Sequence, residues 1–252
     1  NNGWSIGLLE SVTSDEFAKM SDGQNSRKEL VEPQTNYLVA RVQKDYNNNN
    51  SYIGGIVTNT RRFNLNGNLD FLHTNAFSTG IDFKHQWNNK DYFFDGKIIM
   101  SKVKGSEESI TRTQNSIVHM FQRVDADHVS VDENRTSLTG TGGTFTVGRQ
   151  AGGNWTYNAG FDWYSPELEL NDIGYLKQAD NKIQALDIGY RTLKPTKNFR
   201  SIEIGFEQFS TYDFEGNHNR TQYGLNSFLT FKNNFKIGST AAHKPKIFIN
   251  TY

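Results

Sequence analysis

The sequence lacks cysteine, has only 4 prolines, and carries no excess of either charge among its 252 residues, since 27 basic side chains balance 27 acidic ones. The absence of cysteine excludes disulfide bonds, thiolate metal sites and cysteine nucleophiles. The zero net charge gives no general attraction to nucleic acid, so we expect no nucleic-acid partner. The scarcity of proline leaves long strands free to form.

Long apolar runs are missing as well. No segment approaches the roughly 18 consecutive apolar residues that a membrane-spanning helix requires. A strand that crosses a membrane alternates polar and apolar residues instead, so a membrane β-barrel is compatible with the 35% hydrophobic content found here. The composition therefore excludes helical membrane proteins and leaves β-barrels open.

Alternation of polar and apolar residues is the dominant pattern along the chain, and it indicates β-strands. In the stretch 155–163 the odd-numbered positions are Trp, Tyr, Ala, Phe and Trp, while the even-numbered ones are Thr, Asn, Gly and Asp. The pattern predicts about eleven strands, and the start of a twelfth at 247–252. The predicted strands are 4–13, 36–46, 51–61, 76–87, 92–103, 137–149, 155–163, 182–192, 199–212, 222–231 and 235–242.

The predicted connections alternate between short and long. The short ones are rich in asparagine, glycine and lysine, as tight turns require. The long ones fall near 14–35, 62–75, 104–136, 165–181 and 213–221. Short periplasmic turns and long extracellular loops are typical of outer-membrane barrels, and most predicted strands reach the roughly 9 to 11 residues that such a barrel needs. We therefore expect an all-β fold, a transmembrane antiparallel up-and-down barrel of which this chain is one segment, incomplete at both ends.

Aromatic residues gather beside the short turns, where an interfacial girdle would place them. A general preference of aromatic residues for strands is the simpler alternative. The expected girdle consists of Tyr46, Trp87, Tyr92, Trp155, Tyr190, Phe231 and Phe235.

The polar face of the strands would line the lumen of such a barrel. Both charge signs occur on it at similar frequency, so the sequence indicates a wall of ion pairs and hydrogen bonds rather than a filter for one sign. A dedicated substrate track is the less favoured alternative. The lumen-lining candidates are Asp82, Lys84, Asp95, Lys97, Asn158, Asp162, Asp187, Arg191, Glu203 and Glu207.

Motifs for catalysis or cofactors are weak. The six histidines form no close metal-binding pair, and His119 and His128 merely share a polar loop with Asp125 and Asp127. The acidic run that contains Glu167, Glu169 and Asp172 lacks evidence of the opposed carboxylates that glycoside hydrolysis requires. We expect no enzyme activity, no catalytic or metal-binding residue and no cofactor.

Several short motifs, taken in order, resemble a known family. They are GWSIGLLESVT, VEPQTNYLVARVQKDY, SYIGGIVTNTRR, GKIIMSKVKGS, HMFQRVDADH and SPELELNDIGYLKQAD, and they extend to about residue 192. They resemble the DUF5916 family of Bacteroidota. The resemblance implies a larger secreted protein in which a carbohydrate-binding-module-like domain precedes an outer-membrane-type barrel. It implies no catalytic residues and leaves the function unknown.

The function expected from these observations is that of a non-enzymatic component of the bacterial outer membrane, in contact with its lipid, that acts in transport or as a channel. A glycan ligand of the parent protein would fit this role. One alternative is a scaffold whose long loops hold other outer-membrane or surface proteins, and a weaker one is a barrel-borne hydrolase. The loop 104–136 places Ile117, Met120 and Phe121 at near-helical spacing, which predicts an amphipathic segment that either plugs the lumen or docks a partner.

Overall fold

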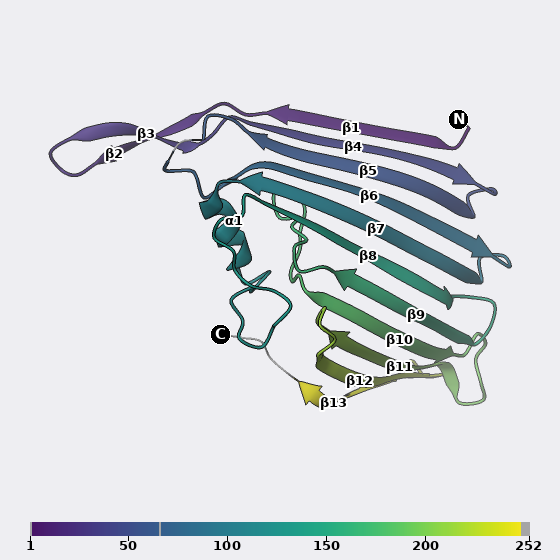
Figure 1. The fold of residues 1–252 in the computed structure, drawn as a ribbon. Coiled ribbons are helices and arrows are strands. Elements are labelled where there is room, and N and C mark those ends of the chain that lie inside the picture. The colour runs from purple at the N-terminus through teal and green to yellow at the C-terminus, as the bar shows by residue number, and fades with distance from the viewer. Residues whose placement is uncertain (1, 66, 248–252) are drawn as a thin grey trace.

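The protein is all-β, as the sequence predicts, and its main feature is one large antiparallel sheet (Figure 1). The computed structural model describes residues 2–65 and 67–247. Eleven strands form the sheet in the order β1-β4-β5-β6-β7-β8-β9-β10-β11-β12-β13, and β2 and β3 form a separate two-stranded sheet. The elements are β1 Trp4–Val12, β2 Glu16–Ser21, β3 Ser26–Glu32, β4 Thr35–Tyr46, β5 Ser51–Arg62, β6 His73–Trp87, β7 Tyr92–Gly105, α1 Glu107–Gln114, β8 Ser137–Arg149, β9 Trp155–Tyr164, β10 Asn181–Arg191, β11 Phe199–Tyr212, β12 His218–Phe231 and β13 Lys236–Ile247.

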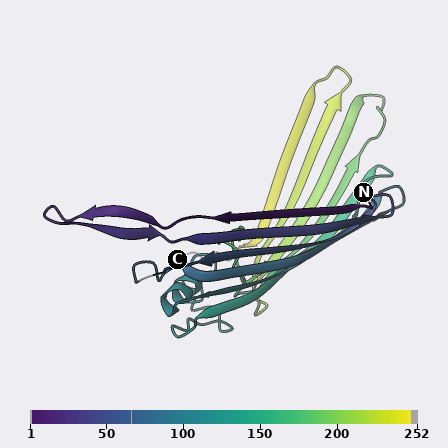
Figure 2. The same cartoon turned by 90° about the horizontal axis from the view of Figure 1, so that it is seen from above.

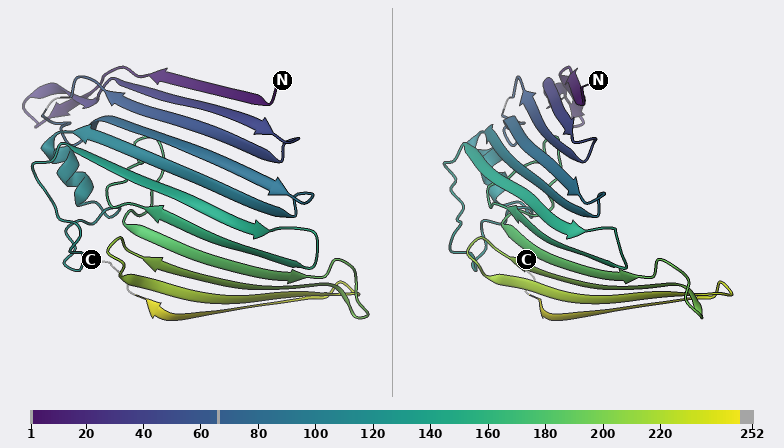
Figure 3. Two further views of the ribbon diagram at one scale, coloured as in Figure 1. Left: turned by 45° about the vertical axis from the view of Figure 1, so that its right-hand side comes forward. Right: turned by 90° about the vertical axis from the view of Figure 1, so that its right-hand side faces the viewer.

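The sheet is an up-and-down meander that does not close into a barrel. Among the described residues, β1 pairs only with β4 and β13 only with β12, so both edges are open. Figures 2 and 3 show that the sheet is strongly curved, with the strands near its two edges bending toward the same side. Within the same residues, no helix is both long and apolar enough to span a membrane.

The predicted strands agree with the structure to within a few residues, and two connections differ from the prediction. The region 14–35 is not a simple loop, because it contains the hairpin of β2 and β3, which projects away from the large sheet (Figures 1 and 2). The loop predicted at 213–221 is shorter, since β12 already begins at His218. The last long connection is therefore no longer than the turn 150–154, so the alternation is less strict than predicted. The predicted strand at 247–252 lies outside the described residues, apart from Ile247 at the end of β13.

The short turns lie at one end of the meander and are made by residues that tolerate a left-handed backbone. Asn47, Asn48 and Asn49 have φ angles of 49°, 52° and 62°, and the turn 88–90 repeats this conformation with Asn, Asn and Lys. Asparagine adopts positive φ more readily than most residues with a side chain. The asparagine runs therefore let β4 and β6 reverse direction within four residues.

One face of the sheet, here called the apolar face, exposes a large hydrophobic side chain from every strand. Residues that pair across strands point to the same side, so the register of the ladders assigns each residue to a face. The exposed residues, one per strand in sheet order, are Ile6, Val42, Ile53, Ile81, Ile98, Val147, Phe161, Ile188, Ile204, Leu225 and Ile237.

The opposite, concave side is here called the polar face, and the core of the protein lies on it near the long connections. Helix α1 contributes Ile110, which is fully buried against Ala76, Val103 and Leu138. A second cluster joins Leu168, Leu176 and Ala179 to Ile99 and Tyr164 of the sheet. The core is therefore made by loops that fold onto the sheet.

Candidate functional site

All ten residues predicted to line a lumen lie on the polar face. The register places Asp82 opposite Lys97 and Lys84 opposite Asp95, and it places Asp187 between Asn158 and Glu207. Arg191 lies opposite Glu203, and Asp162 pairs with Thr144, which is the neighbour of Lys97. Their common face follows from period-2 alternation, which the sequence makes visible.

Ion pairs on this face are concentrated in its N-terminal half. Asp82 accepts two hydrogen bonds from the guanidinium of Arg41, at 2.9 and 2.8 Å, and Lys84 Nζ lies 3.9 Å from Asp95 Oδ2. In the described residues, no ion pair joins Asp187, Arg191, Glu203 or Glu207 to another side chain. The predicted pairing is thus present on one part of the face and absent from the other.

The pair of Arg41 and Asp82 spans three strands. Arg41 belongs to β4 and Asp82 to β6, and Gly54 of β5 lies between them. A Cβ at Gly54 would lie 2.7 Å from Asp82 Oδ1 and 2.9 Å from an Arg41 nitrogen. Glycine is needed here because the two side chains meet directly above it. Arg41 was not among the predicted polar-face residues, and a glycine inside a strand is the signal that could have indicated such a close approach.

Two long connections, 106–136 and 165–180, form a single unit here called the loop cap. The connection 165–180 lies directly on the polar face, where Glu169 N donates a 3.0 Å hydrogen bond to Ser101 Oγ. Leu168 is fully buried over Gly140 and Gly142, and a Cβ at Gly140 would overlap its backbone. The glycines of β8 therefore admit the loop to the sheet.

The connection 106–136 packs onto the connection 165–180. Ser106 caps the start of helix α1, and its side chain accepts a hydrogen bond from Ser109 N. Glu107 and Glu108 in the first turn interact favourably with the helix dipole. Beyond the helix, Ala179 N donates a 2.8 Å hydrogen bond to Val118 O. The two connections thus hold each other on the sheet.

His119 lies at the centre of the loop cap. It is 2% exposed, and its Nε2 lies 3.0 Å from Leu168 O. Burial lowers the pKa of His119, although the nearby Glu169 carboxylate acts in the opposite direction. His119 is therefore held in its neutral form as part of the packing.

Asp172 joins three segments that are far apart in sequence. It lies 2.8 Å from His73 Nδ1 and accepts a 2.6 Å hydrogen bond from Arg62 Nη1, while His73 Nε2 lies 2.8 Å from Thr113 Oγ1 of α1. Burial raises the pKa of Asp172, but the hydrogen bonds and positive charges of His73 and Arg62 outweigh it, and the net pKa is lowered. The cluster fastens the loop cap to the ends of β5 and β6.

Asp180 forms a second, similar cluster. It accepts a 2.6 Å hydrogen bond from Arg123 Nη2, lies 2.9 Å from His128 Nε2, and also accepts a hydrogen bond from Phe214 N. The side chains of Arg123 and Asp180 are almost fully buried. This cluster connects the loop cap to the connection that follows β11.

The predicted amphipathic segment at 117–121 is wrong in its position. The helix is α1, Glu107–Gln114, and residues 117–121 form turns in which Met120 has a φ of 53°. Ile117 is 84% exposed, whereas Phe121 is 3% exposed and packs inside the cap. The polar stretch before Ile117 forms the helix because Ser106 caps it and Ile110 packs in the core. The spacing of apolar residues in the sequence does not show either contact.

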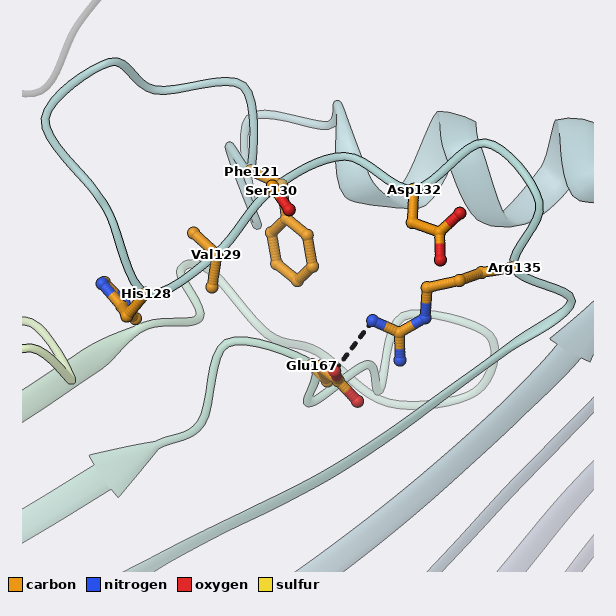
Figure 4. Close-up of a pocket in the computed structure, with 7 residues that line it drawn as sticks. All are labelled: Phe121, His128, Val129, Ser130, Asp132, Arg135 and Glu167. Atoms are coloured by element: carbon orange, nitrogen blue, oxygen red, sulfur yellow. Dashed lines mark hydrogen bonds and ion pairs between the residues drawn. The ribbon is translucent and has the colours of Figure 1, made fainter.

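A pocket of about 330 Å³ lies in the loop cap (Figure 4). Glu167 is the one lining residue from the connection 165–180, and it accepts a 2.9 Å hydrogen bond from Arg135 Nη1. Figure 4 shows the ring of Phe121 between Val129 and Arg135, and the imidazole of His128 directed away from them. The lining residues are Phe121, His128, Val129, Ser130, Asp132, Arg135 and Glu167.

The three carboxylates of the acidic run, Glu167, Glu169 and Asp172, each contact different partners. Glu167 pairs with Arg135, Glu169 accepts from Asn171 N and lies 3.8 Å from His119, and Asp172 pairs with Arg62 and His73. Within residues 2–65 and 67–247, no group of three or more His, Asp or Glu side chains is arranged to hold a metal ion. The side chains of the run act as anchors of the loop cap.

The aromatic residues predicted as a girdle lie at the short-turn end of the strands. Trp87 stacks on Tyr92 with ring centroids 5.7 Å apart, and Trp155 meets Tyr190 edge-on at 5.0 Å. Phe231 contacts Phe235 at 5.9 Å, and Tyr46 ends β4 at the same end of the sheet. The rings therefore gather at one level of the sheet, where two pairs lie across short turns and Trp155 meets Tyr190 on the neighbouring strand.

Comparison with known proteins confirms the resemblance noted in the sequence and extends it to the whole chain. No curated protein matches the chain. The family model described as Domain of unknown function (DUF5916) matches residues 1–252. The chain belongs to the DUF5916 family.

Proposed function

We propose that the sheet is a segment of a transmembrane β-barrel in a bacterial outer membrane, and that it acts in transport without catalysing a reaction. The observation that carries the proposal is the contrast between its faces. Every one of the eleven strands exposes a large apolar side chain on one face, whereas the other face carries charges and the loop cap. Water disfavours so extended an apolar surface, and lipid accommodates it.

The open edges and the aromatic pairs support the same proposal. An unpaired strand edge in lipid would leave backbone groups unsatisfied at several kcal/mol each, so the proposal requires partner strands for β1 and β13 in the membrane. The aromatic pairs beside the short turns occupy the level expected of an interfacial girdle. On this proposal the short turns are periplasmic and the loop cap is extracellular.

The position of the loop cap favours a role as a constriction. The loop cap covers the polar face at the end of the sheet opposite the short turns, and Leu168 and His119 are buried within the cap. In a closed barrel this face would line the lumen, so the cap would narrow its extracellular mouth. A glycan passing through such a mouth would meet carboxylates and basic groups of the polar face, to which its hydroxyl groups can form hydrogen bonds.

Single-channel conductance in planar bilayers tests this role. The full-length protein without residues 108–122 should conduct more than the unaltered protein, because α1 and the chain that follows it would leave the mouth. A matched control removes residues 17–30 of the projecting hairpin, which should leave conductance unchanged. Equal conductance of all three proteins would contradict the constriction.

A scaffold is the second candidate function, and the projecting hairpin favours it. Phe17, Met20 and Val31 are 57%, 47% and 49% exposed on it, beyond the end of the large sheet. Exposed apolar side chains on a projection are suited to bind another surface protein. Loss of a stoichiometric partner on removal of residues 17–30, with unchanged conductance after removal of 108–122, would favour the scaffold over the channel.

A further inference from the structure

The pocket in the loop cap has walls that are fixed before any ligand arrives. Gln114 of α1 is fully buried, and its side-chain amide binds both backbone groups of Asp132, donating to Asp132 O at 2.9 Å and accepting from Asp132 N at 2.8 Å. The backbone of Gln114 also accepts a 2.9 Å hydrogen bond from Phe121 N. One buried residue therefore positions two sides of the pocket, and such preorganisation lowers the entropic cost of binding.

The polar groups of the pocket retain capacity for hydrogen bonds. Arg135 donates to Glu167 Oε1, and among the described residues its guanidinium makes no other hydrogen bond, so donors remain for a ligand. Asp132 Oδ1 accepts from Asn134 N, while Oδ2 has no partner in the described part of the chain. Arg135 and Glu167 are about one-third exposed, within reach of a ligand.

The charges in the pocket select against anions. Asp132 and Glu167 are acidic and Arg135 is basic, while His128 is directed toward Asp180. A ligand carboxylate or phosphate would have to displace Glu167 from Arg135 and then face Asp132. Hydroxyl groups avoid this conflict, because they donate to carboxylates and accept from a guanidinium.

We propose that this pocket binds a neutral polyhydroxylated ligand of one or two sugar rings. Its volume of about 330 Å³ lies at the lower end of the range for small-molecule sites, roughly 300–1,000 Å³. Asp132, Arg135 and Glu167 bind the ring hydroxyls, and the partly exposed side chain of Val129 faces its C–H groups. The inference deepens the proposed function by naming a ligand class at the mouth of the barrel, and it rests on that function only for the location of the pocket.

Isothermal titration calorimetry on the full-length protein in detergent micelles tests the proposal without requiring a conducting channel. The probes are glucose, galactose, maltose and cellobiose. At least one should bind, and Arg135→Ala and Glu167→Gln should each weaken that sugar about tenfold or more, since a hydrogen bond to a charged group is lost. Arg27→Ala, which alters an ion pair on the projecting hairpin, is the matched control and should bind as the unaltered protein does.

Three results would overturn the proposal. They are no heat from any of the four sugars, binding that Arg135→Ala leaves unchanged, and tighter binding of glucuronate or glucose 6-phosphate than of every neutral sugar. Arg135→Lys guards against loss of folding, since it retains the charge and should bind more tightly than Arg135→Ala while both give the same circular dichroism spectrum. Sugar binding without conductance would support the pocket and count against the channel, so the two proposals fail separately.

Discussion

A charge placed on the apolar face distinguishes lipid from water as its surroundings. Phe161 lies on β9, 44% exposed, with its ring 6.2 Å from that of Trp163. It follows the girdle residue Trp155 by six positions, which corresponds to about 20 Å along the strand and about 14 Å of depth at a tilt of roughly 45°. The apolar band of an outer-membrane barrel is about 25 Å tall, so Phe161 would lie near its middle.

The expected penalty follows from that depth. Phe161→Arg should lower the free energy of unfolding by about 2–4 kcal/mol if lipid surrounds the apolar face. In water, a half-exposed site of this kind should change the free energy by about 0.5 kcal/mol or less. The matched control is Asn158→Arg on the same strand, which points to the polar face and should cost much less.

Urea unfolding of the full-length protein in lipid vesicles, followed by tryptophan fluorescence, measures both variants. Ile98→Arg repeats the test on β7, because Ile98 also lies six positions from a girdle residue, Tyr92. A negligible penalty for both arginines would refute lipid exposure. Equal penalties for Phe161→Arg and Asn158→Arg would indicate a sheet covered on both faces by protein.

Three further predictions concern topology, packing and pH. Single cysteines at Lys197 or Asn233 in the short turns should resist an impermeant thiol reagent on intact cells, while cysteines at Gln24 or Glu133 should react, and the reverse pattern would contradict the proposed orientation. Gly54→Ala should destabilise the protein by about 1–3 kcal/mol, measured by urea unfolding, because its Cβ would separate Arg41 from Asp82; Gly7→Ala, where a Cβ meets open space, is its control. Acid should loosen the loop cap. Burial lowers the pKa of His119 in the folded protein below its unfolded value near 6.5. The contribution of neutral His119 to stability is therefore complete above pH 6.5 and is lost as the pH falls below that value. Further loss should follow below the ordinary aspartate pKa of about 3.9, because the pKa of Asp172 is lowered against the effect of burial by His73 and Arg62. A spin label at Glu133 should gain mobility between about pH 8 and pH 5, and equal mobility would contradict the role of His119.

The sequence was sufficient for the strands of the large sheet and for its two faces. Successive residues of a strand point to opposite faces of the sheet. The sequence alone therefore places Phe161 and Asp162 on opposite faces, and likewise Ile98 and Lys97. The short turns were equally visible, because Asn47 to Asn49 and their counterparts near Asn88 suit a left-handed backbone. The family resemblance was recognisable because short motifs are contiguous in the sequence.

The hairpin and the helix were harder to predict. β2 and β3 place Lys19 opposite Lys28 and Glu16 opposite Glu32, so they lack the apolar alternation that marks the other strands. Helix α1 is mostly polar, and Ile110 is the one apolar side chain that it contributes to the core. Apolar periodicity therefore indicated the wrong segment, near Ile117.

The loop cap depended on tertiary structure. His73 and Asp172 are 99 residues apart, and Arg62 and Asp172 are 110 apart, so no local pattern connects them. The bridge of Arg41 and Asp82 over Gly54 and the pocket between Arg135 and Glu167 likewise arise only when separate segments meet. Alternation along the chain fixes which side of the sheet a residue occupies, but contacts between distant side chains depend on register, curvature and loop packing, which only the folded molecule sets.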